Sequence, residues 1–211
     1  MLAVRTAVPA DAPGVEAVCR ATALAGDPVP ESDPTAALVC AVYAEPYLAL
    51  EPSSARLLVD AADTVVGYVV AAVDSVEFYR RWRRHWSARF SAPAGPVPAQ
   101  VGQLHELLAH PERMLPTPGT LTAYPSHLHL DLLPAARGGG WGTRLLAAAL
   151  SGLAAAGSPG VHLGVDTQNV RALRFYQRHG FVPSGRDGDN QTLVLVRACS
   201  PLPATAADAP G

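Results

Sequence analysis

Apolar and polar residues alternate along residues 126–133 in the pattern of a half-buried strand. Leucines at every second position occupy one face, while two histidines and Asp131 occupy the other. Further strands are expected at 2–5, 56–60, 65–73, 161–165, 181–182 and 192–197. Because only a short break at 61–63 separates two of these runs, we expect them to form an antiparallel hairpin.

Helical spacing of apolar residues fills the intervals between these strands. Asp11 with Pro13 predicts the start of a helix that runs to about Leu24, and Asp33 with Pro34 predicts the start of another. Further helices are expected at 75–90, 100–109, 143–156 and 169–179, the last ended by Gly180.

Residues 75–125 differ in character from the rest of the chain. The helix expected at 75–90 carries a stripe of Phe78, Trp82, Trp86 and Phe90, flanked by arginines. A stripe of this kind favours packing in the core, with a lid over an acceptor site or a dimer contact as functional alternatives. Because about 50 residues are marginal for a separate core, we interpret this stretch as an insertion between two strands.

Composition indicates one globular domain. Of the 211 residues, 49% are hydrophobic and 16% are charged, and the formal net charge of −2 gives no general attraction to nucleic acid or an anionic membrane. The 16 basic residues are all arginines, and the missing lysine excludes both a Schiff-base lysine and a Walker phosphate loop. A single domain at 1–199 is expected, with a disordered Pro/Ala-rich tail at 200–211.

The cysteines and the lengths of the apolar runs indicate in which cellular compartment the protein works. The three cysteines are scattered without a CxxC pair, so neither a disulfide framework nor a zinc site is expected. No apolar run reaches the roughly 18 residues of a membrane-spanning helix, and the first residues lack the pattern of a signal peptide. We therefore expect a soluble, cytoplasmic protein.

The sequence Arg-Gly-Gly-Gly-Trp-Gly at 137–142 lies between an expected strand and an expected helix. Glycines let the backbone approach an anion closely, and the first N–H groups of a helix have no partner within it. The alternative is a tight turn without a ligand. A dinucleotide fingerprint G-x-G-x-x-G fails in both registers, because Thr143 and Leu145 stand where it needs glycine.

Two segments resemble the signatures of the GCN5-related N-acetyltransferases. Residues 137–142 satisfy Q/R-x-x-G-x-G/A, and residues 169–181 resemble N-x-x-A-x-x-F/Y-Y-x-x-x-G-F. The likeness covers most of the chain outside 75–125 and the tail. Residues 124–134 and 160–165 are in addition similar to the acetyltransferase-like domain of eukaryotic O-GlcNAcases and its bacterial relatives, some of which are suspected of being catalytically silent.

The resemblance implies an acetyl-coenzyme A site. The backbone of the glycine turn would wrap the pyrophosphate, β-strand residues would pair with the pantetheine arm, and a tyrosine would protonate the departing thiolate. The implied cofactor-binding residues are Leu132, Leu133, Arg137, Gly138, Gly139, Gly140, Trp141, Gly142, Thr143, Asn169 and Tyr176. Tyr176 is the implied acid, because a neutral phenol can supply a proton to a leaving thiolate. Its structural alternative is a packed aromatic with the hydroxyl bonded elsewhere.

An amine acceptor arrives protonated and must lose a proton before it attacks. Candidate bases are Asp131 and Asp166, then His129, with His127 on the same strand face; each could instead make only a structural hydrogen bond. The two histidines could supply half of a metal site, but without a third ligand no metal is expected.

The sequence therefore predicts an α/β (α+β) fold with a mixed, largely antiparallel sheet, flanked by helices and split near Leu132 and Val165 to hold the cofactor. The predicted reaction is direct acetyl transfer from acetyl-CoA to a small-molecule or peptide amine. The main rival is a silent acetyl-CoA-binding or interaction module, and a weaker one uses another acyl group or a hydroxyl acceptor. A homodimer is an open option; nucleic acid and membranes are not expected partners.

Overall fold

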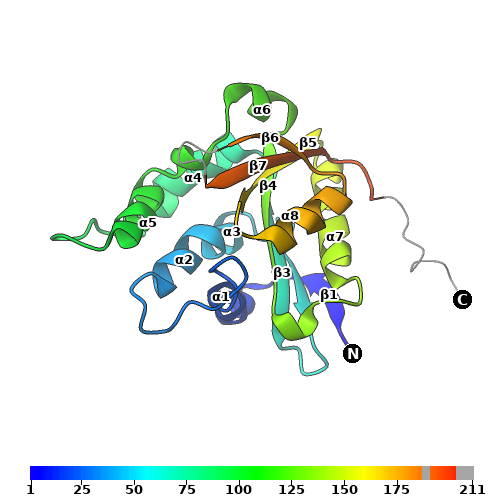
Figure 1. The fold of residues 1–211 in the computed structure, drawn as a ribbon, viewed down its shortest axis with the longest axis horizontal. Helices are drawn as coiled ribbons and strands as arrows, with labels where there is room; N and C mark the ends of the chain where they lie inside the picture. The colour runs from blue at the N-terminus through cyan, green and yellow to red at the C-terminus, as the bar shows by residue number, and fades with distance from the viewer. Residues whose placement is uncertain (187–190, 203–211) are drawn as a thin grey trace, which may run out of the picture.

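The computed structural model describes residues 1–186 and 191–202. Figure 1 shows the described helices arranged around a single sheet. The strands are β1 (Ala3–Thr6), β2 (Arg56–Val59), β3 (Val65–Ala72), β4 (Ser126–Leu132), β5 (Gly160–Asp166), β6 (Val182–Arg186) and β7 (Thr192–Ala198). The α-helices are α1 (Ala12–Arg20), α2 (Ala36–Tyr43), α3 (Glu45–Leu50), α4 (Ser75–His85), α5 (Ala99–Ala109), α6 (Pro118–Ala123), α7 (Trp141–Ala155) and α8 (Val170–Arg178).

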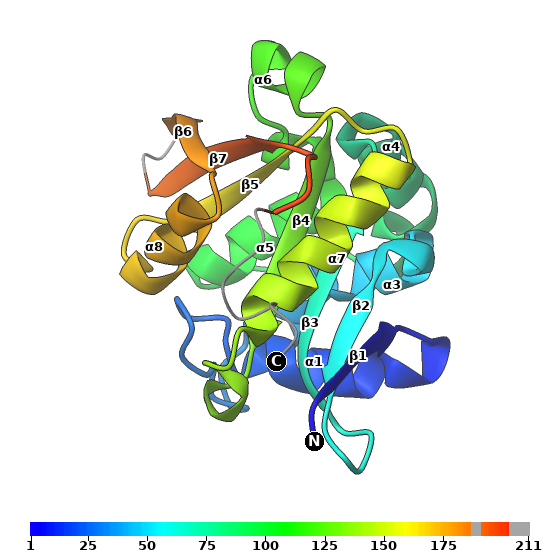
Figure 2. The ribbon, with the colours of Figure 1, turned by 90° about the vertical axis from the view of Figure 1, so that its right-hand side faces the viewer.

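The described strands form a seven-stranded sheet in the order β1-β2-β3-β4-β5-β7-β6. Neighbouring strands are antiparallel except β4 and β5, which are parallel. That parallel pairing holds only at Ser126 with Val161 and at His127 with His162. Beyond this point β4 and β5 diverge, as Figure 2 shows. The expected mixed, largely antiparallel sheet flanked by helices is confirmed, and its split opens earlier along β4 than Leu132.

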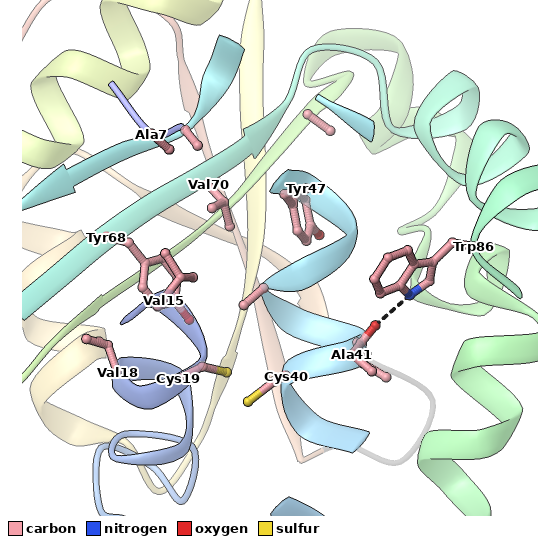
Figure 3. Close-up of a cluster of buried hydrophobic side chains, with 14 of the residues drawn as sticks. Ala7, Val15, Val18, Cys19, Cys40, Ala41, Tyr47, Tyr68, Val70 and Trp86 are labelled. Atoms are coloured by element: carbon pink, nitrogen blue, oxygen red, sulfur yellow. Dashed lines mark hydrogen bonds between the residues drawn. The ribbon is translucent and has the colours of Figure 1, made fainter. Parts of the chain in front are cut away.

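Helices cover both faces of the sheet. On one face, α7 packs Leu145, Leu146 and Leu150 against β2, β3 and β4. On the other, α1 to α4 enclose a second core around the buried Tyr47 and Tyr68, and Figure 3 shows side chains of this cluster. Strand β4 therefore lies between two cores, and it stays paired with β3 as far as Leu132.

The aromatic stripe of α4 belongs to the second core. Phe78 and Trp82 are fully buried, and the Trp82 indole N–H donates to the Leu108 carbonyl of α5 at 3.2 Å. The Trp86 indole N–H donates to the Ala41 carbonyl of α2 at 2.9 Å (Figure 3). The core interpretation of this stripe therefore holds, and its two indole N–H groups bond to α5 and α2.

Helix α1 ends at Arg20, four residues before the expected end at Leu24. The chain turns there, because the Gly26 N–H bonds to the Thr22 carbonyl at 2.9 Å and Ala25 takes a positive φ of 51°. A propensity argument extends a helix through alanine and leucine without seeing such a turn.

Other boundaries also differ from expectation. Helix α2 begins at Ala36, because the Asp33 carboxylate accepts the Thr35 N–H at 2.8 Å and holds the preceding residues in a turn. Helix α4 ends at His85, short of residue 90, and α7 begins at Trp141, two residues early. The short helices α3 and α6, each with a proline in its first turn, were not expected.

Of the tail expected to be disordered at 200–211, residues 203–211 lie outside the described residues. No helix in the described part of the chain combines the length and the apolar character needed to cross a membrane.

Candidate functional site

A cavity of about 640 Å³ lies where β4 and β5 diverge. Its volume falls in the range of roughly 300–1,000 Å³ that small-molecule and cofactor sites occupy. Its walls come from the turn after α1, strand β4, the glycine turn with the first residues of α7, and helix α8. The lining residues are Thr22, Gly26, Leu130, Asp131, Leu132, Arg137, Gly138, Gly140, Trp141, Gly142, Thr143, Asn169, Arg171, Ala172, Phe175, Tyr176, Arg178, His179 and Leu202.

The glycine turn forms one end of the cavity. Gly138, Gly139 and Gly140 take φ values of 84°, 57° and 76°, a left-handed conformation that residues with a Cβ adopt at a cost. An added Cβ on Gly138 or Gly140 would meet nothing within 4 Å, so the backbone conformation and not crowding explains these glycines. The turn leads directly into α7. The first backbone N–H groups of a helix have no partner within it, so this end of α7 can bind an anion.

Positive charge gathers around the same end. Arg137, Arg171 and Arg178 line the cavity. The Arg137 side chain also crosslinks two walls, because its Nε donates to the Leu132 carbonyl and its Nη2 to the Gly26 carbonyl, each at 3.1 Å. Burial and the neighbouring Arg171 lower the pKa of Arg137 below its ordinary value. Guanidinium groups gathered in this way are suited to a phosphorylated ligand.

The main chain of β4 faces the split at alternate residues. The Leu133 N–H donates to the Val66 carbonyl at 2.9 Å, so Leu133 pairs with β3. In an antiparallel ladder the next residue points its N–H and C=O the other way. Leu132 and Leu130 therefore turn their main-chain groups towards the split, and both line the cavity. Of the expected pair, Leu132 lines the cavity and Leu133 does not, whereas Leu130, which was not expected, does.

Helix α8 brings Asn169 and Tyr176 to the cavity. The Asn169 side-chain oxygen accepts the Ala172 N–H at 3.0 Å and caps the helix, which leaves the amide NH₂ to other partners. Tyr176 is only 6% exposed, and burial together with the charge of Asp131 raises the pKa of its hydroxyl above 10. This side chain therefore stays protonated throughout the neutral range.

The Tyr176 hydroxyl opens into the cavity. No described residue hydrogen-bonds to it, and among the described residues the only fully buried side-chain nitrogen or oxygen without a partner is Arg81 Nε. The hydroxyl oxygen must therefore reach open space, and the open space that Tyr176 lines is this cavity. The purely structural interpretation, in which another side chain satisfies the hydroxyl, does not fit this geometry.

The candidate bases separate into one that lines the cavity and three that do not. Asp131 lines it, accepts the Tyr68 hydroxyl at 2.7 Å through Oδ2, and has a pKa that burial raises above 3.8. Asp166 is exposed and accepts the Gln168 N–H at 2.7 Å, away from the cavity. His127 and His129 bond to the buried Tyr47 hydroxyl at 2.7 Å and 3.0 Å.

Sequence reasoning missed several cavity residues. Ala172, Phe175 and His179 recur at helical spacing with the expected Tyr176, so the amphipathic pattern of α8 could have predicted this whole face. Thr22 and Gly26 carry no local signal of this kind, because they reach the cavity only through the turn after α1. Within the described residues no group of three or more His, Cys, Asp or Glu could hold a metal ion.

The free energy of unfolding is expected to fall as the pH drops from about 6.5 to about 4. Burial, with His162 nearby, lowers the pKa of His129 from 6.5 to about 4, and burial lowers that of His127 well below 6.5. Between these pH values the histidines bind protons in the unfolded chain but not in the folded one. Their contribution to the free energy of unfolding is therefore complete above about pH 6.5 and is lost as the pH falls. For His129 the difference corresponds to about 3 kcal/mol.

Urea denaturation at pH 7 and pH 4.5 measures this effect. The variant His129→Leu should lose less stability between the two pH values than the wild type does. An identical loss in both proteins would contradict the buried neutral state of His129.

Comparison with known proteins places these features in context. A family model described as an acetyltransferase (GNAT) domain matches residues 113–183. The crystal structure of a protein named SsHAT is 35% identical, with 94% of this chain and 98% of that chain covered and a TM-score of 0.86.

More distant structures share the fold alone. An agmatine N-acetyltransferase is 19% identical, with 93% of this chain and 99% of that chain covered and a TM-score of 0.57. The PaiA N-acetyltransferase from Thermoplasma acidophilum, in complex with coenzyme A, is 15% identical, with 94% and 99% covered and a TM-score of 0.58.

Proposed function

The chain belongs to the GNAT acetyltransferase family, and we propose that it transfers acetyl from acetyl-CoA directly to an amine. The observation that carries this proposal is the protonated Tyr176 hydroxyl, open to the cavity that also contains Asp131. A silent binding module needs the glycine turn but has no need for an acid and a base in one cavity.

The cavity residues divide into a binding end and a reacting end. At the binding end, the backbone N–H groups of residues 138–142 and the surrounding arginines would hold the pyrophosphate and ribose phosphate of coenzyme A. The main-chain groups of Leu130 and Leu132 would pair with the pantetheine arm, and Asn169, which lines the same cavity, would offer its amide NH₂. With this division, the thioester would lie towards Asp131 and Tyr176.

Three proton transfers at the reacting end would complete the chemistry. Acetyl-CoA would supply the acetyl group when bound, with coenzyme A as the thiolate leaving group. Asp131 would accept a proton from the ammonium group so that its nitrogen can attack, and Tyr176 would donate its hydroxyl proton to the departing sulfur. The second proton that the nitrogen loses as the amide forms would then restore the Tyr176 hydroxyl. The raised pKa of each group suits its part, since Asp131 becomes a stronger base and Tyr176 remains protonated.

We further propose that the chain belongs to the subgroup that resembles the acetyltransferase-like domain of O-GlcNAcases. Support comes from residues 124–134 and 160–165, which carry that resemblance. Part of this pattern has a structural explanation here: the His162 Nδ1–H donates to the Tyr124 carbonyl at 2.7 Å and so connects β5 to the start of β4. Silent members of such a subgroup make the binding-module alternative specific and testable.

Two assays in parallel test the proposed function. Calorimetric titration measures acetyl-CoA binding, and release of free thiol, with mass spectrometry of the products, measures acetylation of an alkylamine, glucosamine and a lysine-containing peptide. Binding with acetylation of at least one amine is the expected result. Binding without any acetylation would establish the silent module instead.

Asp131→Asn is expected to lower kcat about a hundredfold, because the amide cannot accept the proton of the amine. The acid limb of the wild-type pH profile should lie above the ordinary aspartate pKa, since burial raises that of Asp131. Steady-state kinetics between pH 5 and 9 measure both effects.

Asp166→Asn is the matched control for this change. It removes the same charge from an exposed residue outside the cavity and should leave kcat within about twofold of the wild type. Equal losses in both variants would remove Asp131 from the mechanism.

A further inference from the structure

A continuous line of hydrogen bonds runs through the buried side chains beside β4. Ser75 Oγ lies 2.6 Å from the Pro125 carbonyl oxygen and 2.7 Å from His127 Nδ1. His127 Nε2 lies 2.7 Å from the Tyr47 hydroxyl, which lies 3.0 Å from His129 Nε2. Ser75 and Tyr47 are fully buried and His127 is 4% exposed, so these bonds compete with little water.

The hydrogens in this line can be assigned from one end. The Pro125 carbonyl can only accept a hydrogen bond, so the Ser75 hydroxyl donates its single hydrogen to it. His127 Nδ1 must then carry the hydrogen that bonds to Ser75 Oγ. Burial and the neighbouring His162 hold the pKa of His127 well below 6.5, so its ring is neutral and Nε2 has no hydrogen.

The assignment continues through Tyr47 to His129. The Tyr47 hydroxyl donates to the bare His127 Nε2, which leaves its oxygen to accept a hydrogen from His129 Nε2. His129 is neutral at physiological pH because its pKa is about 4. Its single hydrogen is therefore on Nε2, and its Nδ1 carries a free lone pair.

Nδ1 of His129 has no partner among the described residues. Arg81 Nε is the only buried unpartnered side-chain nitrogen or oxygen among them, so Nδ1 keeps some exposed surface. His129 does not itself line the cavity, but it directly precedes Leu130 and Asp131, which do. His129 lies two residues before Asp131 on the same face of β4, beyond the last residue that pairs with β5. The Tyr43 ring lies beside it, with centroids 5.5 Å apart.

We propose that Ser75, His127 and Tyr47 hold His129 in the Nε2–H tautomer, and that its Nδ1 accepts a hydrogen bond from the incoming amine. This inference rests on the proposed acetyl transfer to an amine. Asp131 removes one proton from the ammonium group, and a primary amine still has N–H groups that can donate to His129. The three preceding residues are positioning residues, and His129 is the group that contacts the acceptor.

The tautomers can be measured without any acceptor. In full-length protein labelled with ¹⁵N-histidine, long-range ¹H–¹⁵N spectra report which ring nitrogen carries the hydrogen. We expect Nδ1–H for His127 and Nε2–H for His129. Tyr47→Phe should leave His127 unchanged and give His129 a mixture of tautomers, whereas Tyr124→Phe, which removes a hydroxyl without a described partner, should change neither. A wild-type His129 protonated on Nδ1 would overturn the proposal.

The contact with the acceptor needs a second measurement on the same labelled protein. With coenzyme A bound, an alkylamine, glucosamine and a lysine-containing peptide are titrated in turn. At least one should shift the His129 Nδ1 resonance. For that amine, His129→Leu should raise KM about threefold to tenfold, as expected for one hydrogen bond, with KM for acetyl-CoA unchanged.

His129→Asn, which keeps an amide oxygen near the Nδ1 position, should recover part of the loss. If no amine shifts the resonance, the acceptor role is wrong whatever the thiol assay shows. Acetylation that does not depend on His129 would leave the proposed function standing and reject this inference alone.

Discussion

Gly140→Asp is expected to weaken the binding of acetyl-CoA about a thousandfold. The new carboxylate would lie in the turn that leads into α7, against the phosphates that this turn is proposed to hold. Two negative charges about 4 Å apart repel by about 4 kcal/mol at an effective dielectric constant of about 20. Calorimetric titration with acetyl-CoA measures the change in Kd.

Two controls separate charge from backbone strain. Gly140→Asn has nearly the same shape and tolerates the positive φ of 76°, so it should bind far better than the aspartate variant. Gly152→Asp adds the same charge to an exposed position of the same helix and should bind as the wild type does. Unchanged affinity in Gly140→Asp would refute the assignment of the turn.

Tyr176→Phe is expected to lower kcat by about 10²- to 10⁴-fold, the range that a general acid contributes. The ring packing should survive, because the contact with Phe181, at 5.2 Å between centroids, does not involve the hydroxyl. The Kd for acetyl-CoA should therefore stay within about twofold of the wild type. Steady-state kinetics and calorimetry on the same preparation measure both quantities.

The pH profile gives this prediction a second readout. Because burial raises the pKa of Tyr176 above 10, the wild-type rate should not fall on the alkaline side up to about pH 9.5. Wild-type kcat in the phenylalanine variant would assign the proton on the leaving thiolate to another donor.

The features that the sequence predicted well are local in the chain. The glycine turn at 137–142 and the helix with Tyr176 were expected from residue types at fixed spacing, and the structure places both at one cavity. Each segment carries its own geometry, since positive φ values and a helix start depend on neighbouring residues.

The features that the sequence did not predict depend on distant partners. The hydrogen bond between Leu133 and Val66 decides which leucines of β4 turn their main-chain groups towards the split. No pattern within β4 alone fixes that register. The hydrogen bond of His129 Nε2 similarly depends on Tyr47, which lies in the unexpected helix α3. Asp131 and Asp166 were equally plausible bases until the fold left only Asp131 at the cavity.

A crystal structure with bound acetyl-CoA tests the central claim most directly. We predict that the pyrophosphate lies within hydrogen-bonding distance of the backbone N–H groups of residues 138–142. The pantetheine arm should pass between β4 and β5 along Leu130 and Leu132, and the sulfur should lie beside the Tyr176 hydroxyl. A cofactor bound elsewhere, or one whose sulfur lies away from both Tyr176 and Asp131, would contradict the proposed mechanism.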